Sequence, residues 1–160
     1  MRARLLAPAL AVSLLLLAGC SEGKNEVVVT KTTAEGMQLT EPRLVLPIVK
    51  DSPGAVYFTL VNSSAKPRKI LSIEIAGGDM AMIHDTVDKG GHSSMTMAHD
   101  VVVAAGSSMA FAPGGRHVMV TGLKPDLKPG ADTELKINFD TGDALVTSLP
   151  VAAPAAAAGN

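Results

Sequence analysis

Histidine and methionine are the residues of this 160-residue chain that could bind a soft metal ion, and eight of the twelve lie in two short stretches. Residues 80–97, MAMIHDTVDKGGHSSMTM, contain two His and four Met, and the stretch RHVMV places His117 two residues before Met119. Imidazole and thioether are the ligands that a soft, monovalent metal ion prefers. Calcium and magnesium would require oxygen ligands, and zinc would more often recruit thiolate or further imidazole. The ligand types therefore point to copper, and to Cu(I) in particular.

Each of these residues also has an ordinary structural interpretation. Methionine commonly fills gaps in a hydrophobic core, and a lone histidine is usually just hydrogen-bonded. In an extended run, His117 and Met119 share one face, while the two valines that alternate with them take the other face and are expected in the core. The same alternation puts Met80, Met82 and His84 on one face. We expect the two methionines of that run to pack and His84 to bind.

Short apolar runs, separated by turns rich in Gly, Pro and Asp, must position these side chains. In several runs apolar and polar residues alternate with the period of a strand that buries one face, as Val56, Phe58 and Leu60 do in AVYFTLVN. Leu135, Ile137 and Phe139 do the same in ELKINFD. Strands at this spacing predict one all-β domain, an antiparallel sandwich or Greek-key barrel. The predicted strands cover residues 27–31, 44–49, 55–62, 69–75, 80–85, 108–112, 117–122, 133–139 and 144–149.

The amino terminus has the pattern of a secretory signal. Two arginines precede an apolar run at residues 5–18, which is too short to span a membrane comfortably. Residues 17–20, LAGC, resemble a bacterial lipobox, in which Cys20 becomes the lipidated first residue; the alternative is an ordinary cleavage site beside an unrelated Cys. We expect a lipoprotein signal peptide at 1–19 and a lipid anchor at the periplasmic face of a bacterial membrane, with Ser21 favouring the outer membrane.

Composition limits the remaining functions and sets the domain boundaries. Cleavage after residue 19 removes Arg2 and Arg4, which leaves 12 basic and 15 acidic residues and a net charge of −3. Nucleic-acid binding is not expected, because it would require a clustered basic face. We expect residues 20–36 to hold the lipidated Cys, a tether and a first strand, and residues 37–150 to form the folded domain. Residues 151–160, mostly Ala, are expected to be a disordered tail.

Four of the candidate ligands, His84, Met95, His117 and Met119, are spaced as H-x10-M-x21-H-x-M. This pattern resembles the signature of the periplasmic copper chaperones of the PCuAC type. The stretches GAVYFTLVN at 54–62 and PGGRHVMVTGLKPDLKPG at 113–130 are similar to further blocks of that family, so the resemblance covers about residues 37–140. It implies a cupredoxin-like β-barrel that binds one Cu(I) through these four residues. It also implies delivery to a copper-accepting respiratory oxidase subunit or another copper assembly chaperone, with cytochrome c oxidase assembly as the leading target.

Some features depart from the family pattern. The chain has no Trp, although the family commonly has one near its first strand. Residues 141–160 lack His and Met, so the metal-binding extension that some members carry is not expected. Within the cluster, His92, Met97 and His99 are expected in or beside a solvated glycine loop, with a secondary or entry metal site as the alternative.

The candidate ligands leave one other class of protein open and disfavour two more. A periplasmic copper-buffering or resistance lipoprotein with no oxidase target would use the same binding chemistry and stays open. A blue-copper electron carrier would need a Cys thiolate, and Cys20 is the only cysteine. An enzyme is not expected, because no nucleophile-base motif is recognisable and four protein ligands would leave the metal no open position for a substrate.

Overall fold

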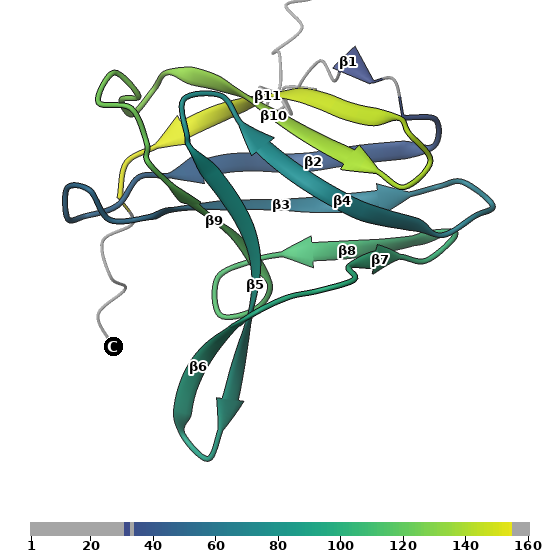
Figure 1. Ribbon diagram of the computed structural model, residues 1–160, viewed down its shortest axis with the longest axis horizontal. Coiled ribbons are helices and arrows are strands. Elements are labelled where there is room, and N and C mark those ends of the chain that lie inside the picture. The colour runs from purple at the N-terminus through teal and green to yellow at the C-terminus, as the bar shows by residue number, and fades with distance from the viewer. Residues whose placement is uncertain (1–30, 33, 155–160) are drawn as a thin grey trace, which may run out of the picture.

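The computed structural model describes residues 31–32 and 34–154, which form eleven β-strands (Figure 1). Among these residues, no helix is long and apolar enough to cross a membrane. The expected signal peptide, Cys20 and residues 155–160 lie outside the described residues. The strands are β1 Lys31–Thr32, β2 Met37–Val45, β3 Gly54–Asn62, β4 Arg68–Ile75, β5 Met80–Lys89, β6 His92–Met97, β7 Val102–Val103, β8 Ser107–Phe111, β9 His117–Thr121, β10 Asp132–Phe139 and β11 Ala144–Ala152.

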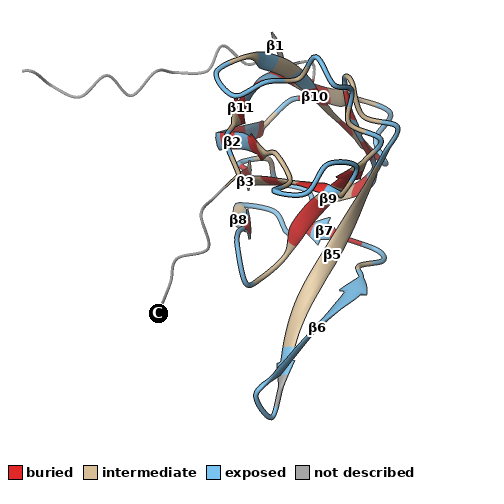
Figure 2. Ribbon diagram, turned by 90° about the vertical axis from the view of Figure 1, so that its left-hand side faces the viewer, coloured by how far each residue is buried: buried red, intermediate tan, exposed pale blue. Residues whose placement is uncertain are grey.

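All eleven strands belong to one sheet. Neighbouring strands follow the order β6-β5-β9-β3-β2-β11-β10-β4-β7, while β1 pairs with β11 and β8 pairs with β3. The pairings are antiparallel except that of β11 with β2, which is parallel. In Figure 2 the sheet is seen rolled into a barrel, and β5 and β6 continue beyond the barrel as a projecting hairpin. The prediction of a single all-β domain is confirmed.

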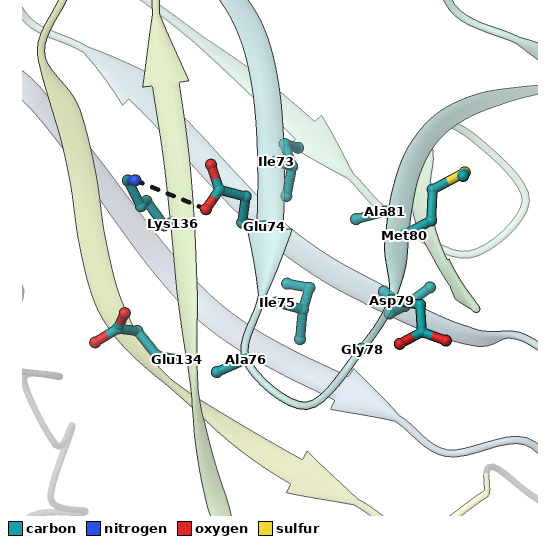
Figure 3. Close-up of a pocket in the computed structure, with 11 residues that line it drawn as sticks. Ile73, Glu74, Ile75, Ala76, Gly78, Asp79, Met80, Ala81, Glu134 and Lys136 are labelled. Atoms are coloured by element: carbon teal, nitrogen blue, oxygen red, sulfur yellow. Dashed lines mark ion pairs between the residues drawn. The ribbon is translucent and has the colours of Figure 1, made fainter. Parts of the chain in front are cut away.

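The two ends of the rolled sheet meet where β4 approaches β5, and we call this junction the β4–β5 seam. Two cavities open along it, of about 480 and 370 Å³. Figure 3 shows the larger one, between Ile75 of β4, Met80 of β5 and Lys136 of β10. Lys136 Nζ lies 3.7 Å from Glu74 Oε2 at its edge. The seam therefore leaves side chains of β5 accessible beside the barrel wall.

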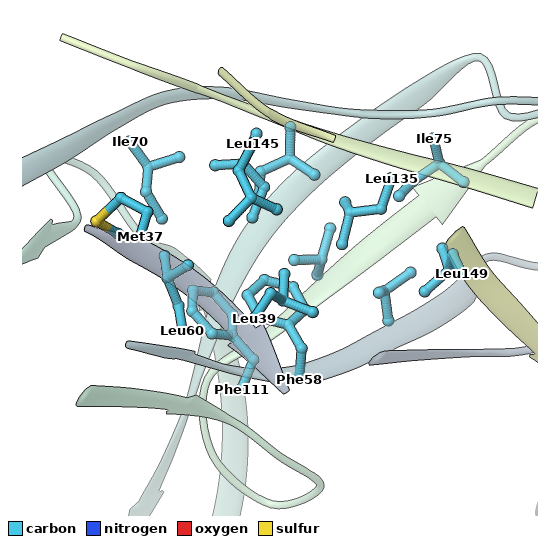
Figure 4. Packing of buried hydrophobic residues seen from close by; sticks show 14 of the residues in the cluster. Met37, Leu39, Phe58, Leu60, Ile70, Ile75, Phe111, Leu135, Leu145 and Leu149 are labelled. Carbon is cyan, nitrogen blue, oxygen red and sulfur yellow. The ribbon is translucent and has the colours of Figure 1, made fainter. Parts of the chain in front are cut away.

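The core fills the inside of the barrel, as the alternation of the sequence predicts. Val56, Phe58 and Leu60 of β3 are at most 2% exposed, and Phe58 stacks on Phe111 of β8 with ring centroids 4.3 Å apart. Figure 4 shows this aromatic pair packed among aliphatic side chains of several strands. The inward residues predicted for β10 are also buried: Leu135, Ile137 and Phe139.

Asn62 is the fully buried residue that ends β3. Its side-chain amide donates to the backbone carbonyls of Lys66 and Val103 at 2.8 and 3.1 Å, and its Oδ1 accepts from Ser64 N–H at 3.0 Å. A buried amide is costly unless it is hydrogen-bonded. Through these hydrogen bonds Asn62 links the β3–β4 turn to β7.

The region between residues 85 and 95 differs from the prediction of a solvated glycine loop. β5 continues to Lys89 and β6 begins at His92, so this region is a two-stranded hairpin. Its turn lies at Gly90 and Gly91, which have φ values of 63° and 82°. All six residues of β6 are exposed, and a strand exposed on both faces has no alternation of apolar and polar residues by which it could be recognised.

Two predicted boundaries are also wrong. The tail was expected to begin at Val151, but Val151 and Ala152 belong to β11, and Val151 is 3% exposed and pairs with Leu44. A strand was expected at 44–49, whereas β2 runs from Met37 to Val45. Its register shifts between Thr40 and Arg43, and this irregularity interrupts the alternation that would have marked the strand.

Candidate metal centre

Strands β5 and β9 bring together the two stretches that hold the candidate ligands. They pair with His84 opposite His117 and Met82 opposite Met119. Directly opposed residues of antiparallel strands point to the same face, with Cβ atoms about 4.5–5.5 Å apart. The valines that alternate with His117 and Met119 are fully buried in the core. The His and Met side chains therefore share the outer face of the barrel wall.

The imidazole ring of His117 is held in one orientation. It is 7% exposed, and its Nδ1 lies 3.0 Å from the backbone oxygen of Gly115. A carbonyl oxygen can only accept, so Nδ1 carries the proton and neutral His117 keeps the lone pair of Nε2 free for a metal. The ring of Tyr57 lies on another side, with its centroid 6.5 Å from that of His117.

His84 presents a buried nitrogen with no hydrogen bond. Its Nδ1 has no partner among the described residues. Leaving such a group unsatisfied costs about 1–3 kcal/mol, and a bound metal ion would remove that cost. The ring centroids of His84 and His117 are 6.1 Å apart, with an angle of 26° between the rings. With metal–nitrogen bonds of about 2 Å, two imidazoles that share one ion would have their centroids at a separation of about this size.

The β5–β6 hairpin adds two thioethers to this face. Met97 is directly opposite His84, and Met95 is opposite Thr86. Met95 is therefore a diagonal neighbour of His84, about 7–8 Å away by strand geometry and within reach of a long side chain. Met95 is 61% exposed and Met97 is 49% exposed. The hairpin thus supplies the predicted Met95 together with Met97, which register places closer to His84.

A bidentate ion pair joins β5 to the turn before β9. Arg116 Nε and Nη2 lie 2.7 and 2.9 Å from the two carboxylate oxygens of Asp85, and Arg116 Nη1 lies 3.0 Å from Met109 Sδ. The hydrogen bond from Arg116 holds the pKa of Asp85 below its ordinary value, and Asp85 raises the pKa of Arg116. Each partner is the chain neighbour of a candidate histidine, so the pair supports the register that aligns the two rings.

The three candidates for a secondary site are not brought together as a group. His92 pairs with Lys89 at the tip of the hairpin, five residue pairs from His84 and so about 16 Å along the strand. Met97 and His99 instead line the smaller cavity of the β4–β5 seam. His92 is therefore separated from the other two.

The described residues contain no group of three or more His, Cys, Asp or Glu that could hold a metal ion. The candidate centre is a pair of histidines with methionines beside it. Met80, which was expected to pack, is 57% exposed, and Met82 lies partly exposed opposite Met119.

The model of the LpqE-like family, described as "Putative lipoprotein LpqE-like", matches residues 37–151. The chain belongs to the LpqE-like family. This LpqE-like chain is 28% identical over 104 residues to "Uncharacterized protein RP573" of Rickettsia prowazekii (strain Madrid E). It is 28% identical over 98 residues to "Putative lipoprotein Lxx21020" of Leifsonia xyli subsp. xyli. The alignments cover 64% and 61% of this chain but 58% and 59% of those relatives, so the chain spans under two thirds of their length.

Solved PCuAC domains share the fold of this LpqE-like chain. The copper-bound PCuAC domain from PmoF2 superimposes with a TM-score of 0.62 and 19% identity, over 74% of this chain and 94% of that one. The apo PmoF2 domain gives 0.61 and 19%, over 78% and 96%. CuI-DR1885 from Deinococcus radiodurans gives 0.56 and 27%, over 72% and 76%. The cupredoxin-like barrel and the likeness to PCuAC domains, both expected from the sequence, are confirmed.

Sequence reasoning missed the residues that support the two histidines in this LpqE-like domain. The carbonyl of Gly115 and the ring of Tyr57 carry no recognisable signal, because a backbone oxygen and a single aromatic have no fixed spacing. A signal for the ion pair was present. Asp85 follows one candidate histidine and Arg116 precedes the other, so the two motifs carry opposite charges at matching positions of an antiparallel pair.

Proposed function

We propose that this protein is a copper chaperone that binds one Cu(I) through His84, Met95, His117 and Met119. The observation that carries the proposal is the cross-strand pair of histidines, with ring centroids 6.1 Å apart and Met119 on the same face. The similarity to CuI-DR1885, at 27% identity, supports Cu(I) as the ion. Neutral imidazole and thioether ligands suit this ion.

The histidine ligands and the methionine ligands serve different steps, the first retention of the ion and the second its release. His117 is buried and its ring is oriented by Gly115, so it holds the ion in place. Met95 is 61% exposed on a projecting hairpin, where an incoming ligand from another protein can replace it. A thioether is released without the uptake of a proton, unlike a thiolate. The protein therefore acts by binding and transfer and not as an enzyme.

The proposal also covers the cellular location of the protein and the protein that receives its copper. Lipidation at Cys20 would hold the domain at the periplasmic face of a bacterial membrane, and the lipoprotein description of the family supports this. The recipient is a copper site of cytochrome c oxidase or another assembly chaperone. Mixing the Cu(I)-loaded domain with an isolated oxidase copper domain tests delivery, and absence of copper from the recipient would support the buffering role instead.

Competition titration against a colorimetric Cu(I) chelator tests the binding site, with Zn(II) and Cu(II) titrated in parallel. We expect one tightly bound Cu(I) per chain, and we expect His117→Ala or Met119→Ala to weaken this binding by at least about tenfold. The variant that replaces all four ligands by Ala should lose this tight binding.

Two matched variants serve as controls. Met80→Leu removes an exposed thioether of the same outer face, and His92→Ala removes an imidazole at the hairpin tip. Both should keep wild-type affinity at the first equivalent. A quadruple variant that still binds Cu(I) with the first-step affinity of the wild type would refute the assigned site, and absence of Cu(I) binding by the wild type would refute the function.

A further inference from the structure

The smaller cavity of the β4–β5 seam is lined by metal-ligating residues that the proposed function does not use together. It has a volume of about 370 Å³, and Met82, Met97 and His99 are among its lining residues. Two thioethers and an imidazole are again the ligand types of a soft monovalent metal ion. The apolar residues of the same cavity are Ile70, Leu71, Ile73, Ala81, Ile83, Ala98 and Val101.

The path of the backbone just after β6 explains why these three residues line one cavity. Met97 ends β6, and the next backbone N–H, that of Ala98, donates to the carbonyl of Ile83 at 2.9 Å. The chain therefore still follows β5 at this point. His99, the next residue, lines the same cavity as Met82 and Met97. Met82 and Met97 share the face of His84, because Met82 is two residues from it along β5 and Met97 is directly opposite it.

The charges around the cavity are already compensated. Lys69 and Asp100 also line it, and Lys69 Nζ lies 2.5 Å from Asp100 Oδ1. The ammonium group that would repel a cation is thus paired with a carboxylate. Thioether and imidazole ligands favour a soft monovalent cation over a strongly hydrated divalent one.

We propose that Met82, Met97 and His99 form a second site for Cu(I), or for its analogue Ag(I), beside the first. This goes beyond the proposed function, which assigns one ion to four other residues. Met82 is the cross-strand neighbour of Met119, and Met97 is that of His84. An ion in the second site therefore lies next to ligands of the first, which makes it an entry or transfer position.

Titration of the folded domain with Ag(I), followed by the methyl resonances of its methionines, tests this proposal. Ag(I) is used because it cannot be oxidised to a divalent ion under these conditions. We expect two equivalents to bind, the second shifting the methyl signals of Met82 and Met97. The double variant Met82→Leu, His99→Ala should weaken the second step by at least about tenfold and leave the first unchanged. Circular dichroism checks that each variant is folded.

Controls separate this proposal from the proposed function. Met80→Leu and His92→Ala should keep both equivalents. His84→Ala with His117→Ala should lose the first step and keep the second. A wild type that binds one equivalent, abolished by the histidine double variant, would overturn the second site and leave the chaperone site standing. Retention of the second step in Met82→Leu, His99→Ala would also overturn it.

Discussion

At the scale of single residues, the candidate centre depends on which nitrogen of each imidazole is free. The Gly115 carbonyl fixes the proton of His117 on Nδ1, and the buried Nδ1 of His84 has no hydrogen-bond partner among the described residues. The His117 ring is thus oriented by a hydrogen bond within the protein. The buried nitrogen of His84 is available to a metal ion. The methionines differ from these rings in being more exposed, Met95 most of all.

Exposure of the thioethers makes their oxidation a test of which ones bind. With peroxide, Met80, Met95 and Met97 of the apo protein should form sulfoxides readily, because each is about half exposed or more. One equivalent of bound Ag(I), the analogue of Cu(I) that peroxide does not oxidise to a divalent ion, should protect Met95 and Met119 but not Met80. Peptide mass spectrometry measures each site. Equal oxidation of Met95 with and without the ion would remove it from the ligand set in favour of Met97.

At the scale of strands, the pairing of β5 with β9 creates the centre, and a charge pair supports it. Asp85 and Arg116 stand next to the two histidines and join β5 to the turn that leads into β9. The hairpin of β5 with β6 then carries further thioethers over the same face. A shift of either pairing by one residue would turn the ligands to the opposite face of the sheet.

The depressed pKa of Asp85 predicts how this contact depends on pH. Because the pKa is lower in the folded than in the unfolded state, the ionised carboxylate stabilises the fold above the unfolded pKa of about 3.9. This stability is lost as the pH falls through the folded pKa. Asp85→Asn should reduce the unfolding free energy of the apo protein by about 1 kcal/mol at pH 7, and the difference should shrink below about pH 4.

Urea unfolding of the wild type and the variant across this pH range measures the effect. Asp126→Asn, at an exposed position of the β9–β10 connection, is the matched control and should change stability little at any pH. An Asp85→Asn deficit that stays constant down to pH 2 would show that the ionised pair is not its cause.

At the scale of the whole molecule, one continuous core supports the wall that carries the ligands. Strand β3, which buries Val56, Phe58 and Leu60 inside, pairs with both β8 and β9. Because the inner face already provides the hydrophobic burial, side chains of the outer face are not needed for the core and are available to bind a ligand. Two cavities open in this wall at the seam between β4 and β5.

The stacked pair of Phe58 and Phe111 gives a test of the core. Phe111 is 2% exposed, so Phe111→Ala should lower the unfolding free energy by about 3–5 kcal/mol through lost burial and a residual cavity. Leu71→Ala, at a position 62% exposed, should change it by less than about 0.5 kcal/mol. Chemical denaturation of the apo domain compares the two. Similar losses in both variants would contradict the assigned core.

The sequence by itself determined the inward residues of the central strands and the candidate ligands. Alternation reports burial on one face, and the ligand types and spacing are read directly from the chain. Tertiary structure decided the rest. Only strand register set His84 opposite His117 and placed Met97 nearer to His84 than Met95 is. Register arises from hydrogen bonds between distant segments, and the exposed β6 has no periodic pattern, so neither the hairpin nor the cavity that Met82 and His99 both line could be derived from local sequence.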